Sequence, residues 1–171
     1  MTTINKKVCL LGDIAVGKTS LVRRFVYNTF DDKHLSSIGV KVSRKTMQVP
    51  QSNQLIGLTM MLWDLAGSER FDQVKSSYIR GTAGVVLVCD LTRADTLLNL
   101  QTYLDDLQQS SREAKVIVAA NKADLISQQE SSASDVAEIA AGFSAPYYLT
   151  SAKSGSGIEP LFRHLARLLL D

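Results

Sequence analysis

Five short apolar runs most limit what this chain can fold into. They lie at Val8–Leu11, Thr59–Asp64, Gly84–Asp90, Lys115–Ala120 and Tyr147–Thr150. Continuous apolar runs of this length are typical of strands that are covered on both faces. Segments with helical periodicity follow four of the runs, at Lys18 to about Phe25, Leu97 to about Gln109, Ser134–Ala141 and Ile158–Leu169. The alternation predicts an α/β fold with a parallel sheet and right-handed crossovers.

One segment departs from this alternation. Residues Ile38–Val49 have the pattern of a strand, and the polar sequence PQSNQ at Pro50–Gln54 turns the chain into the next strand without a helix. We therefore expect this pair of strands to be antiparallel. At the start of the last helix, Ser156 and Glu159 have the spacing of a capping box, which predicts how that helix begins.

Composition excludes several classes of function. The 171 residues, 45% of them hydrophobic, suffice to bury the core of a single domain spanning residues 1–171. Lys and Arg number 19 against 17 Asp and Glu, and the scattered net charge of +2 argues against a nucleic-acid partner. Cys9 and Cys89 lie inside apolar runs, which favours buried free thiols. Without a signal pattern, an apolar run of about 20 residues or a prenylation cysteine, we expect a cytoplasmic protein with no intrinsic membrane anchor.

The sequence GDIAVGKT, Gly12–Thr19, is the strongest motif in the chain. It fits the phosphate-loop pattern G-x-x-x-x-G-K-[ST], and it follows a predicted strand and opens a predicted helix, as such a loop must. Gly12 and Gly17 allow backbone N–H groups to close around phosphate oxygens beside the positive end of the helix. Lys18 can reach the outer phosphates, and the Thr19 hydroxyl can bind Mg²⁺. The alternative, a glycine-rich turn with a surface lysine, does not account for the strand and helix on either side.

A second motif, NKAD at Asn121–Asp124, selects the base. It follows the Lys115–Ala120 strand and so lies at the carboxyl edge of the sheet, where α/β proteins bind ligands. The carboxylate of Asp124 can accept both N1–H and the 2-amino group of guanine, a pair that adenine does not offer. Such a loop alone is an ordinary turn. Together with a phosphate loop it predicts a guanine-nucleotide site.

Asp64 and Gly67 follow the predicted strand at Thr59–Trp63. The carboxylate of Asp64 can reach Mg²⁺ through a water, and Gly67 can offer a backbone N–H to a γ-phosphate with no side chain in the way. A plain turn after a strand has the same sequence pattern, so this assignment depends on the other motifs. Segments that contact γ-phosphate and Mg²⁺ are those that a nucleotide switch releases after hydrolysis.

Four motifs together give the chain a family resemblance. GDIAVGKT, WDLAGSER (Trp63–Arg70), NKAD and TSAK (Thr150–Lys153) resemble the small GTPases of the Ras superfamily. The sequence SSIGV, followed by WDLAGSERF and SSYIRGTAGVVLVCDLT, is most similar to the Rab branch, whereas the phosphate loop resembles that of the Rho branch. The resemblance implies the phosphate-loop GTPase fold: a six-stranded, mostly parallel sheet with one antiparallel edge strand and about five helices. It also implies a GTP/GDP switch with Mg²⁺, effector proteins bound through the switch regions, and GTPase-activating and exchange factors.

The resemblance assigns roles to individual residues. The nucleotide-binding positions are Gly12, Ile14, Ala15, Val16, Gly17, Lys18, Thr19, Ser20, Phe30, Gly67, Asn121, Lys122, Asp124, Ser151, Ala152 and Lys153. Within this set Phe30 would pack against the base. The Mg²⁺ ligands are Thr19, Ser37 and Asp64, with Ser37 binding only in the triphosphate state. The candidate catalytic residues are Lys18, Gly67 and Ser68.

Ser68 departs from the family pattern. The family places a glutamine here, which orients the attacking water, and a serine hydroxyl is too short for that task. Positioning supplies most of phosphoryl-transfer catalysis, so its loss slows the reaction and leaves binding intact. We therefore expect a weak GTPase that a partner assists. The alternative is a GTP-binding module that does not hydrolyse GTP appreciably and acts by effector binding alone.

Overall fold

The computed structural model describes residues 3–31, 40–65 and 77–171. Its centre is a six-stranded sheet in the order β2-β3-β1-β4-β5-β6. The strands are β1 (Thr3–Leu11), β2 (Val40–Gln51), β3 (Gln54–Leu65), β4 (Gly84–Asp90), β5 (Lys115–Asn121) and β6 (Tyr147–Leu149). Only the pairing of the edge strand β2 with β3 is antiparallel, and the other four pairings are parallel. The predicted mixed sheet with one antiparallel edge strand is confirmed.

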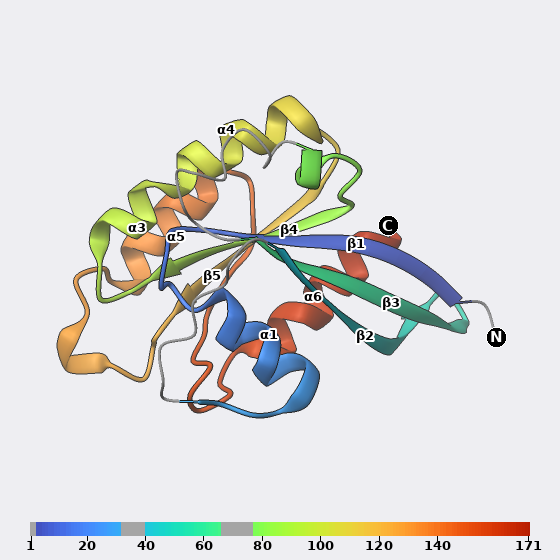
Figure 1. The fold of residues 1–171 in the computed structure, drawn as a ribbon, viewed down its shortest axis with the longest axis horizontal. Coiled ribbons are helices and arrows are strands. Elements are labelled where there is room, and N and C mark those ends of the chain that lie inside the picture. Colours follow the sequence, from blue (N-terminus) through green and yellow to red (C-terminus); the bar gives the residue numbers. More distant parts are fainter. Residues whose placement is uncertain (1–2, 32–39, 66–76) are drawn as a thin grey trace.

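Helices cover both faces of this sheet (Figure 1). Five α-helices and one 3₁₀ turn have both ends within the described residues: α1 (Lys18–Tyr27), α3 (Ala94–Leu98), α4 (Leu100–Ser110), η2 (Ile126–Gln128), α5 (Ala133–Gly142) and α6 (Ile158–Leu170). Residues 77–79 are also helical. Helices α1 and α6 pack on one face, and α3, α4 and α5 pack on the other. The α/β class and the number of helices agree with the prediction. No helix in the described ranges combines the length and the apolar character that a membrane span needs.

Strand β4 shows why the apolar runs do not alternate with polar residues. All seven of its residues are buried. Val86 and Val88 belong to the core under α1 and α6, whereas Val85, Leu87 and Cys89 belong to the core under α3, α4 and α5. A strand in the middle of a three-layer fold needs apolar side chains on both faces, so the period of two disappears from its sequence.

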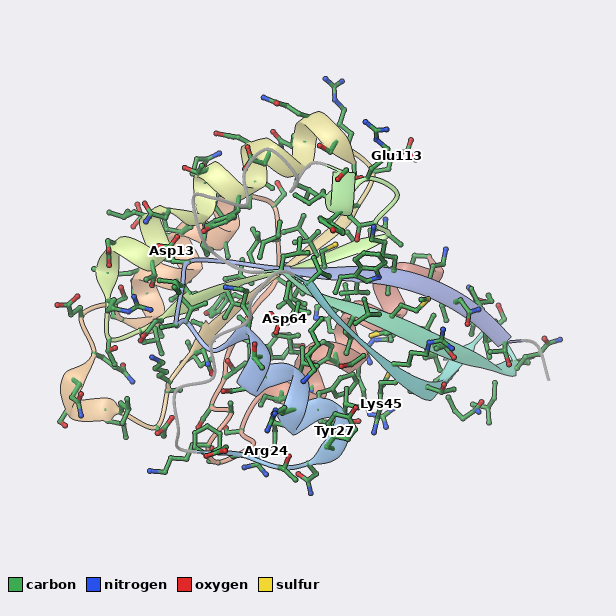
Figure 2. All side chains as sticks on the ribbon, viewed as in Figure 1. Asp13, Arg24, Tyr27, Lys45, Asp64 and Glu113 are labelled. Atoms are coloured by element: carbon green, nitrogen blue, oxygen red, sulfur yellow. The ribbon has the colours of Figure 1, made fainter. Side chains whose placement is uncertain are left out.

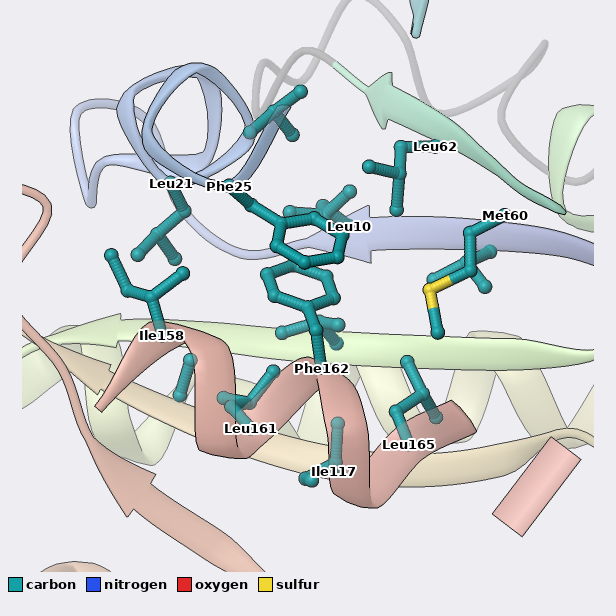
Figure 3. Close-up of a cluster of buried hydrophobic side chains, with 14 of the residues drawn as sticks. Leu10, Leu21, Phe25, Met60, Leu62, Ile117, Ile158, Leu161, Phe162 and Leu165 are labelled. Carbon is teal, nitrogen blue, oxygen red and sulfur yellow. The ribbon is translucent and has the colours of Figure 1, made fainter. Parts of the chain in front are cut away.

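The core between the sheet and α6 is organised around one aromatic pair (Figure 3). The rings of Phe25 on α1 and Phe162 on α6 are stacked, with centroids 3.9 Å apart. Leu161 and Leu165 lie on the same side of α6, as its apolar stripe predicts, and both are buried. This pair joins the first and last helices over the sheet, and thereby fixes the helix that follows the phosphate loop.

The two cysteines are buried and free, as predicted. Burial raises the pKa of both thiols, that of Cys89 to about 12. Since the thiolate is the reactive form, both side chains act as small apolar groups of the core.

Three local expectations were wrong. The predicted turn Pro50–Gln54 is shorter, because the strands continue to Gln51 and resume at Gln54, and only residues 52–53 lie between them. Proline is tolerated here because β2 is an edge strand. The strands predicted at Val8–Leu11 and Thr59–Asp64 begin earlier, at Thr3 and Gln54; the first five residues of β1, TINKK, are mostly polar and are not buried. The helix predicted at Leu97–Gln109 is two helices, α3 and α4, which meet at Asn99.

The predicted capping box at Ser156 and Glu159 is also wrong. Helix α6 begins after Gly157, which has a φ of 75° and carries no side chain to cap the helix. A Cβ at this glycine would lie 2.1 Å from the carbonyl oxygen of Leu149, so the close approach of the chain to β6 decides the N-cap. The described residues do contain a capping box, formed by Ser132 and Asp135 at the start of α5.

The aromatic pair generates a stability prediction. Phe162→Ala removes a fully buried ring and its stacking partner's contact, so we expect the free energy of unfolding to fall by about 3–5 kcal/mol. Chemical denaturation followed by circular dichroism measures this loss. The matched control is Leu98→Ala at a side chain that is 65% exposed, which should change stability by less than about 0.5 kcal/mol. Equal losses in the two variants would contradict the assignment of Phe162 to the core.

Candidate nucleotide site

The phosphate loop connects β1 to α1 at the carboxyl edge of the sheet. Gly17, the residue before α1, has a φ of 107°, and a Cβ there would lie 2.2 Å from Nδ2 of Asn121. Glycine is therefore required for two reasons, the backbone conformation and the approach of the asparagine. Ala15 also lies in the left-handed region, with a φ of 65°. A non-glycine residue is held in that region only by its surroundings.

Side chains bind a continuous series of carbonyl oxygens along this loop. Lys18 Nζ donates to Gly12 and Asp13 (2.8 and 2.9 Å), Arg93 Nη2 to Ile14 (2.9 Å), Lys122 Nζ to Ala15 (3.0 Å) and Asn121 Nδ2 to Val16 (3.0 Å). In a trans peptide the C=O of one residue and the N–H of the next point in opposite directions. The N–H groups of residues 15–17 are therefore turned away from Arg93, Lys122 and Asn121. The three N–H groups are thus left available beside the N-terminus of α1, where backbone donors suit an anion.

Asp64 lies at the end of β3, beside the first turn of α1 (Figure 2). The Thr19 hydroxyl donates to its Oδ2 atom. Asp64 is only 2% exposed, so its carboxylate is held at the floor of the site. A hydroxyl and a carboxylate side by side are hard oxygen donors of the kind that Mg²⁺ takes together with phosphate oxygens and waters. These residues fit a magnesium site.

The NKAD residues lie beside the phosphate loop. Asn121 ends β5 and is buried, and its Oδ1 accepts from the Thr150 hydroxyl at 3.2 Å. Asp124 is exposed, and its Oδ1 accepts from the hydroxyl of Ser151 at 2.8 Å. Ser151 itself is 1% exposed. A buried hydroxyl thus fixes the orientation of an accessible carboxylate, as a site that reads hydrogen-bond donors on a ligand requires.

Arg24 links α1 to the loop at residues 151–153. Its Nε donates to the carbonyl oxygen of Ala152 at 2.8 Å, and its Nη2 donates to that of Lys153 at 2.6 Å. Through this arginine, labelled in Figure 2, the helix that begins at the phosphate loop also positions the TSAK residues. The sequence contained no signal for this contact, because the partners are more than a hundred residues apart and the acceptors are backbone atoms.

Asp90, at the end of β4, is a buried carboxylate that the sequence reasoning missed. It is 1% exposed and forms ion pairs with Lys122 Nζ at 2.7 Å and Arg93 Nε at 3.1 Å. Burial raises the pKa of Asp90, but hydrogen bonds from Lys122 and from Thr92 outweigh burial and hold the pKa below its ordinary value. The carboxylate is therefore charged at neutral pH and holds the positively charged side chains of Lys122 and Arg93 beside the phosphate loop.

Asp13 connects the phosphate loop to helices α3 and α4, on the face of the sheet that α1 does not cover. Its carboxylate accepts from Asn99 Nδ2 at 2.7 Å and from the Tyr103 hydroxyl at 2.9 Å. Asn99 joins α3 to α4, and Tyr103 lies on α4. The variable second position of the motif thus holds the loop in place, a role that a pattern of glycines and lysine does not reveal.

The structure brings most of the predicted site residues to one edge of the sheet. The phosphate-loop residues, Thr19, Asp64, and the NKAD and TSAK residues are connected by the contacts above. Ile14 is 57% exposed, and Phe30 is half-buried against the core under α1 and α6. Ser20 is half-buried in the first turn of α1. The predictions for Ser37, Gly67 and Ser68 lie outside the described residues.

Comparison with known proteins agrees with this geometry. Residues 7–171 match the model of the Ras family. The chain is 40% identical to human Ras-related protein Rab-31 over 162 residues, which cover 94% of this chain and 81% of that protein. It is 38% identical to human Ras-related protein Rab-22A, with the same coverage of 94% and 81%. Identity to Ras-related protein Rab-1D of Dictyostelium discoideum is 32%, over 94% of this chain and 78% of that protein.

The packing of Gly17 generates a second prediction. In Gly17→Ala the new Cβ would overlap the Asn121 amide and leave the Val16 carbonyl without its donor. We expect a loss of about 2–4 kcal/mol in the free energy of unfolding, measured by chemical denaturation. The matched control is Gly142→Ala at the end of α5, where a Cβ meets nothing within 4 Å. That variant should be neutral or more stable by up to about 1 kcal/mol, and a Gly17→Ala protein of parental stability would contradict the contact.

Proposed function

This chain belongs to the Ras family, and we propose that it binds GTP and GDP with Mg²⁺ at the described site and hydrolyses GTP slowly unless a partner assists. Family membership supports a GTP-binding switch of Rab-like sequence and, in general terms, a GTPase activity. The observation that best supports the finer proposal is the series of carbonyl contacts along the phosphate loop. It turns the N–H groups of residues 15–17 to one side, where phosphate oxygens can accept from them.

The residues around this row of N–H groups suit the rest of a nucleotide. The ammonium group of Lys18 donates to the carbonyl oxygens of Gly12 and Asp13 in the loop. In this position it would also donate to a β- or γ-phosphate. Asp124, oriented by Ser151, would accept from N1–H and the 2-amino group of guanine. Ala152 and Lys153 would support this pocket from the loop that Arg24 holds.

Thr19 and Asp64 would hold Mg²⁺, with Ser37 as a further ligand in the triphosphate state. When bound, this ion would neutralise charge on the β- and γ-phosphates. Lys18 would stabilise the same charge, and the N–H of Gly67 would bind the γ-phosphate. A water would then attack the γ-phosphorus, the bond from the γ-phosphorus to the bridging oxygen would break with its electron pair remaining on GDP, and the water's proton would leave with the inorganic phosphate. Ser68 is too short to orient this water, which is the basis for proposing slow hydrolysis.

Partners follow from the same reasoning. We propose that an effector binds the switch segments when GTP is bound, and that activating and exchange factors control the two states. An activating partner that supplies an arginine can accelerate hydrolysis by up to about 10⁵-fold. The alternative, a module that retains GTP without appreciable hydrolysis, predicts that cell extract will not accelerate turnover. The proposed GTPase predicts that it will.

Base selectivity tests the proposal directly. The parent protein should bind GDP far more tightly than ADP. Asp124→Asn should weaken GDP binding by about 100-fold, because it replaces one acceptor oxygen by an NH₂ group, which cannot accept from the N1–H or 2-amino group of guanine. Competition against a fluorescent GDP analogue measures both affinities. Asp105→Asn, at a carboxylate on α4 that accepts from Gln101, is the matched control and should bind as the parent does. Equal affinity of the parent for GDP and ADP would refute the proposal.

Hydrolysis tests the role of Ser68. Ser68→Gln should place an amide within reach of the attacking water and raise the single-turnover rate by about tenfold, equivalent to about 1.4 kcal/mol of barrier, with little change in nucleotide affinity. Ser68→Ala should match the parental rate if the hydroxyl contributes nothing. A glutamine variant no faster than the alanine variant would show that Ser68 does not limit hydrolysis.

A further inference from the structure

Arg93 contacts the phosphate loop although none of the nucleotide-binding motifs contains it. It lies between β4 and α3, at the N-cap of α3. Its Nη2 donates to the carbonyl oxygen of Ile14 at 2.9 Å, and its Nε lies 3.1 Å from Oδ2 of Asp90. The planar guanidinium group thus bridges a buried carboxylate and the backbone of the loop. The two contacts come from different nitrogen atoms of one rigid plane, whereas a lysine carries all its donors on a single nitrogen atom at the end of a flexible chain.

The segment that carries Arg93 is rigidly held. The Asp90 Oδ1 atom accepts from the backbone N–H and the hydroxyl of Thr92, at 2.8 and 2.6 Å. The buried hydroxyl of Thr96 donates to the carbonyl oxygen of Arg93 at 2.7 Å, and Glu130 accepts from the next backbone N–H, that of Ala94, at 2.9 Å. Because the backbone on both sides is fixed, the contact with Ile14 costs only the ordering of the arginine side chain.

The contact sets the direction of one peptide group. The Ile14 carbonyl points to Arg93, so the N–H of Ala15 points the opposite way. The next two peptide groups are held in the same manner by Lys122 and Asn121 of the NKAD motif. Arg93 holds the peptide next to them, and Ala15, at its end, has the left-handed φ of 65° that needs such support.

We propose that Arg93 is a positioning residue of the nucleotide site, which holds the Ile14–Ala15 peptide so that the Ala15 N–H faces a bound phosphate and thereby slows nucleotide release. The inference rests on the proposed function. Arg93 acts through the backbone of the loop and does not itself touch the nucleotide. The Asp90 carboxylate anchors it, and Lys122 shares that anchor.

The test compares Arg93→Gln with Arg163→Gln in the full chain. Arg163 pairs with Glu159 at 3.0 Å on the exposed face of α6, so it is a matched arginine in an ion pair remote from the site. Release of a fluorescent GDP analogue should be about five- to tenfold faster in Arg93→Gln, because a charge-assisted hydrogen bond to a partly exposed group is lost, and unchanged in Arg163→Gln. The ³¹P resonances of bound GDP should shift only in Arg93→Gln, a change that a purely structural role would not cause.

Arg93→Lys tests whether the site needs the two-point contact of Arg93 with Asp90 and Ile14 or only its positive charge. The lysine variant keeps the positive charge but loses the fixed two-point contact that Nε and Nη2 make with Asp90 and Ile14, so we expect it to release GDP at nearly the rate of the glutamine variant. Parental release by Arg93→Lys would overturn the inference. The inference would also be overturned if Arg93→Gln released GDP at the parental rate and left the ³¹P resonances of bound GDP unshifted. A change in the melting temperature of that variant would not rescue it. A parent protein that binds no GDP would overturn the proposed function, and this inference with it.

Discussion

The backbone of the phosphate loop depends on donors for its carbonyl oxygens. To leave several successive N–H groups available to a ligand, the loop must turn the corresponding oxygens the opposite way, toward the ends of the neighbouring strands, and the oxygen of Val16 is buried there. A buried acceptor without a partner costs about 1–3 kcal/mol, so these oxygens need donors. The donors are Asn121 and Lys122 from the end of β5, and Arg93 from the connection after β4. Since β1, β4 and β5 are neighbours, the order of the sheet brings these donors to the loop.

The sequence predicted the fold well where burial controls the pattern. Strands β4 and β5 were predicted within one residue, because they lie in the middle of the sheet and are mostly buried on both faces, so their sequences are nearly continuous apolar runs. The failures occur where a local contact overrides the pattern. Asn99 divides one amphipathic segment into α3 and α4, with its side chain bound to Asp13. Gly157 replaces the expected cap because β6 leaves no space for a Cβ.

Where a short motif carries the candidate site, as at Lys18, Thr19 and Asn121, the sequence predicted which residues would lie together at the carboxyl edge of the sheet. The site was not predictable where the function of a residue depends on a distant backbone atom. Arg24 and Arg93 each donate to carbonyl oxygens far away in the sequence, and such contacts leave no trace in residue type or spacing. Arg24 is positioned by the packing of α1 and Arg93 by the short connection after β4, and only the folded chain determines both.

The contacts of Asp13 and Arg24 join the candidate site to the helices on both faces of the sheet. Asp13 binds Tyr103 of α4 on one face of the sheet, and Arg24 of α1 binds the loop at residues 152–153 on the other. The loop that would receive the phosphates is therefore part of the packing of the fold. A ligand that binds only this arrangement stabilises the folded chain by RT ln(1 + [L]/Kd), so stability and nucleotide occupancy are thermodynamically coupled. By the same linkage, a partner that binds only a chain in which the contacts of Asp13 or Arg24 are broken would compete with any ligand that needs those contacts, without touching that ligand.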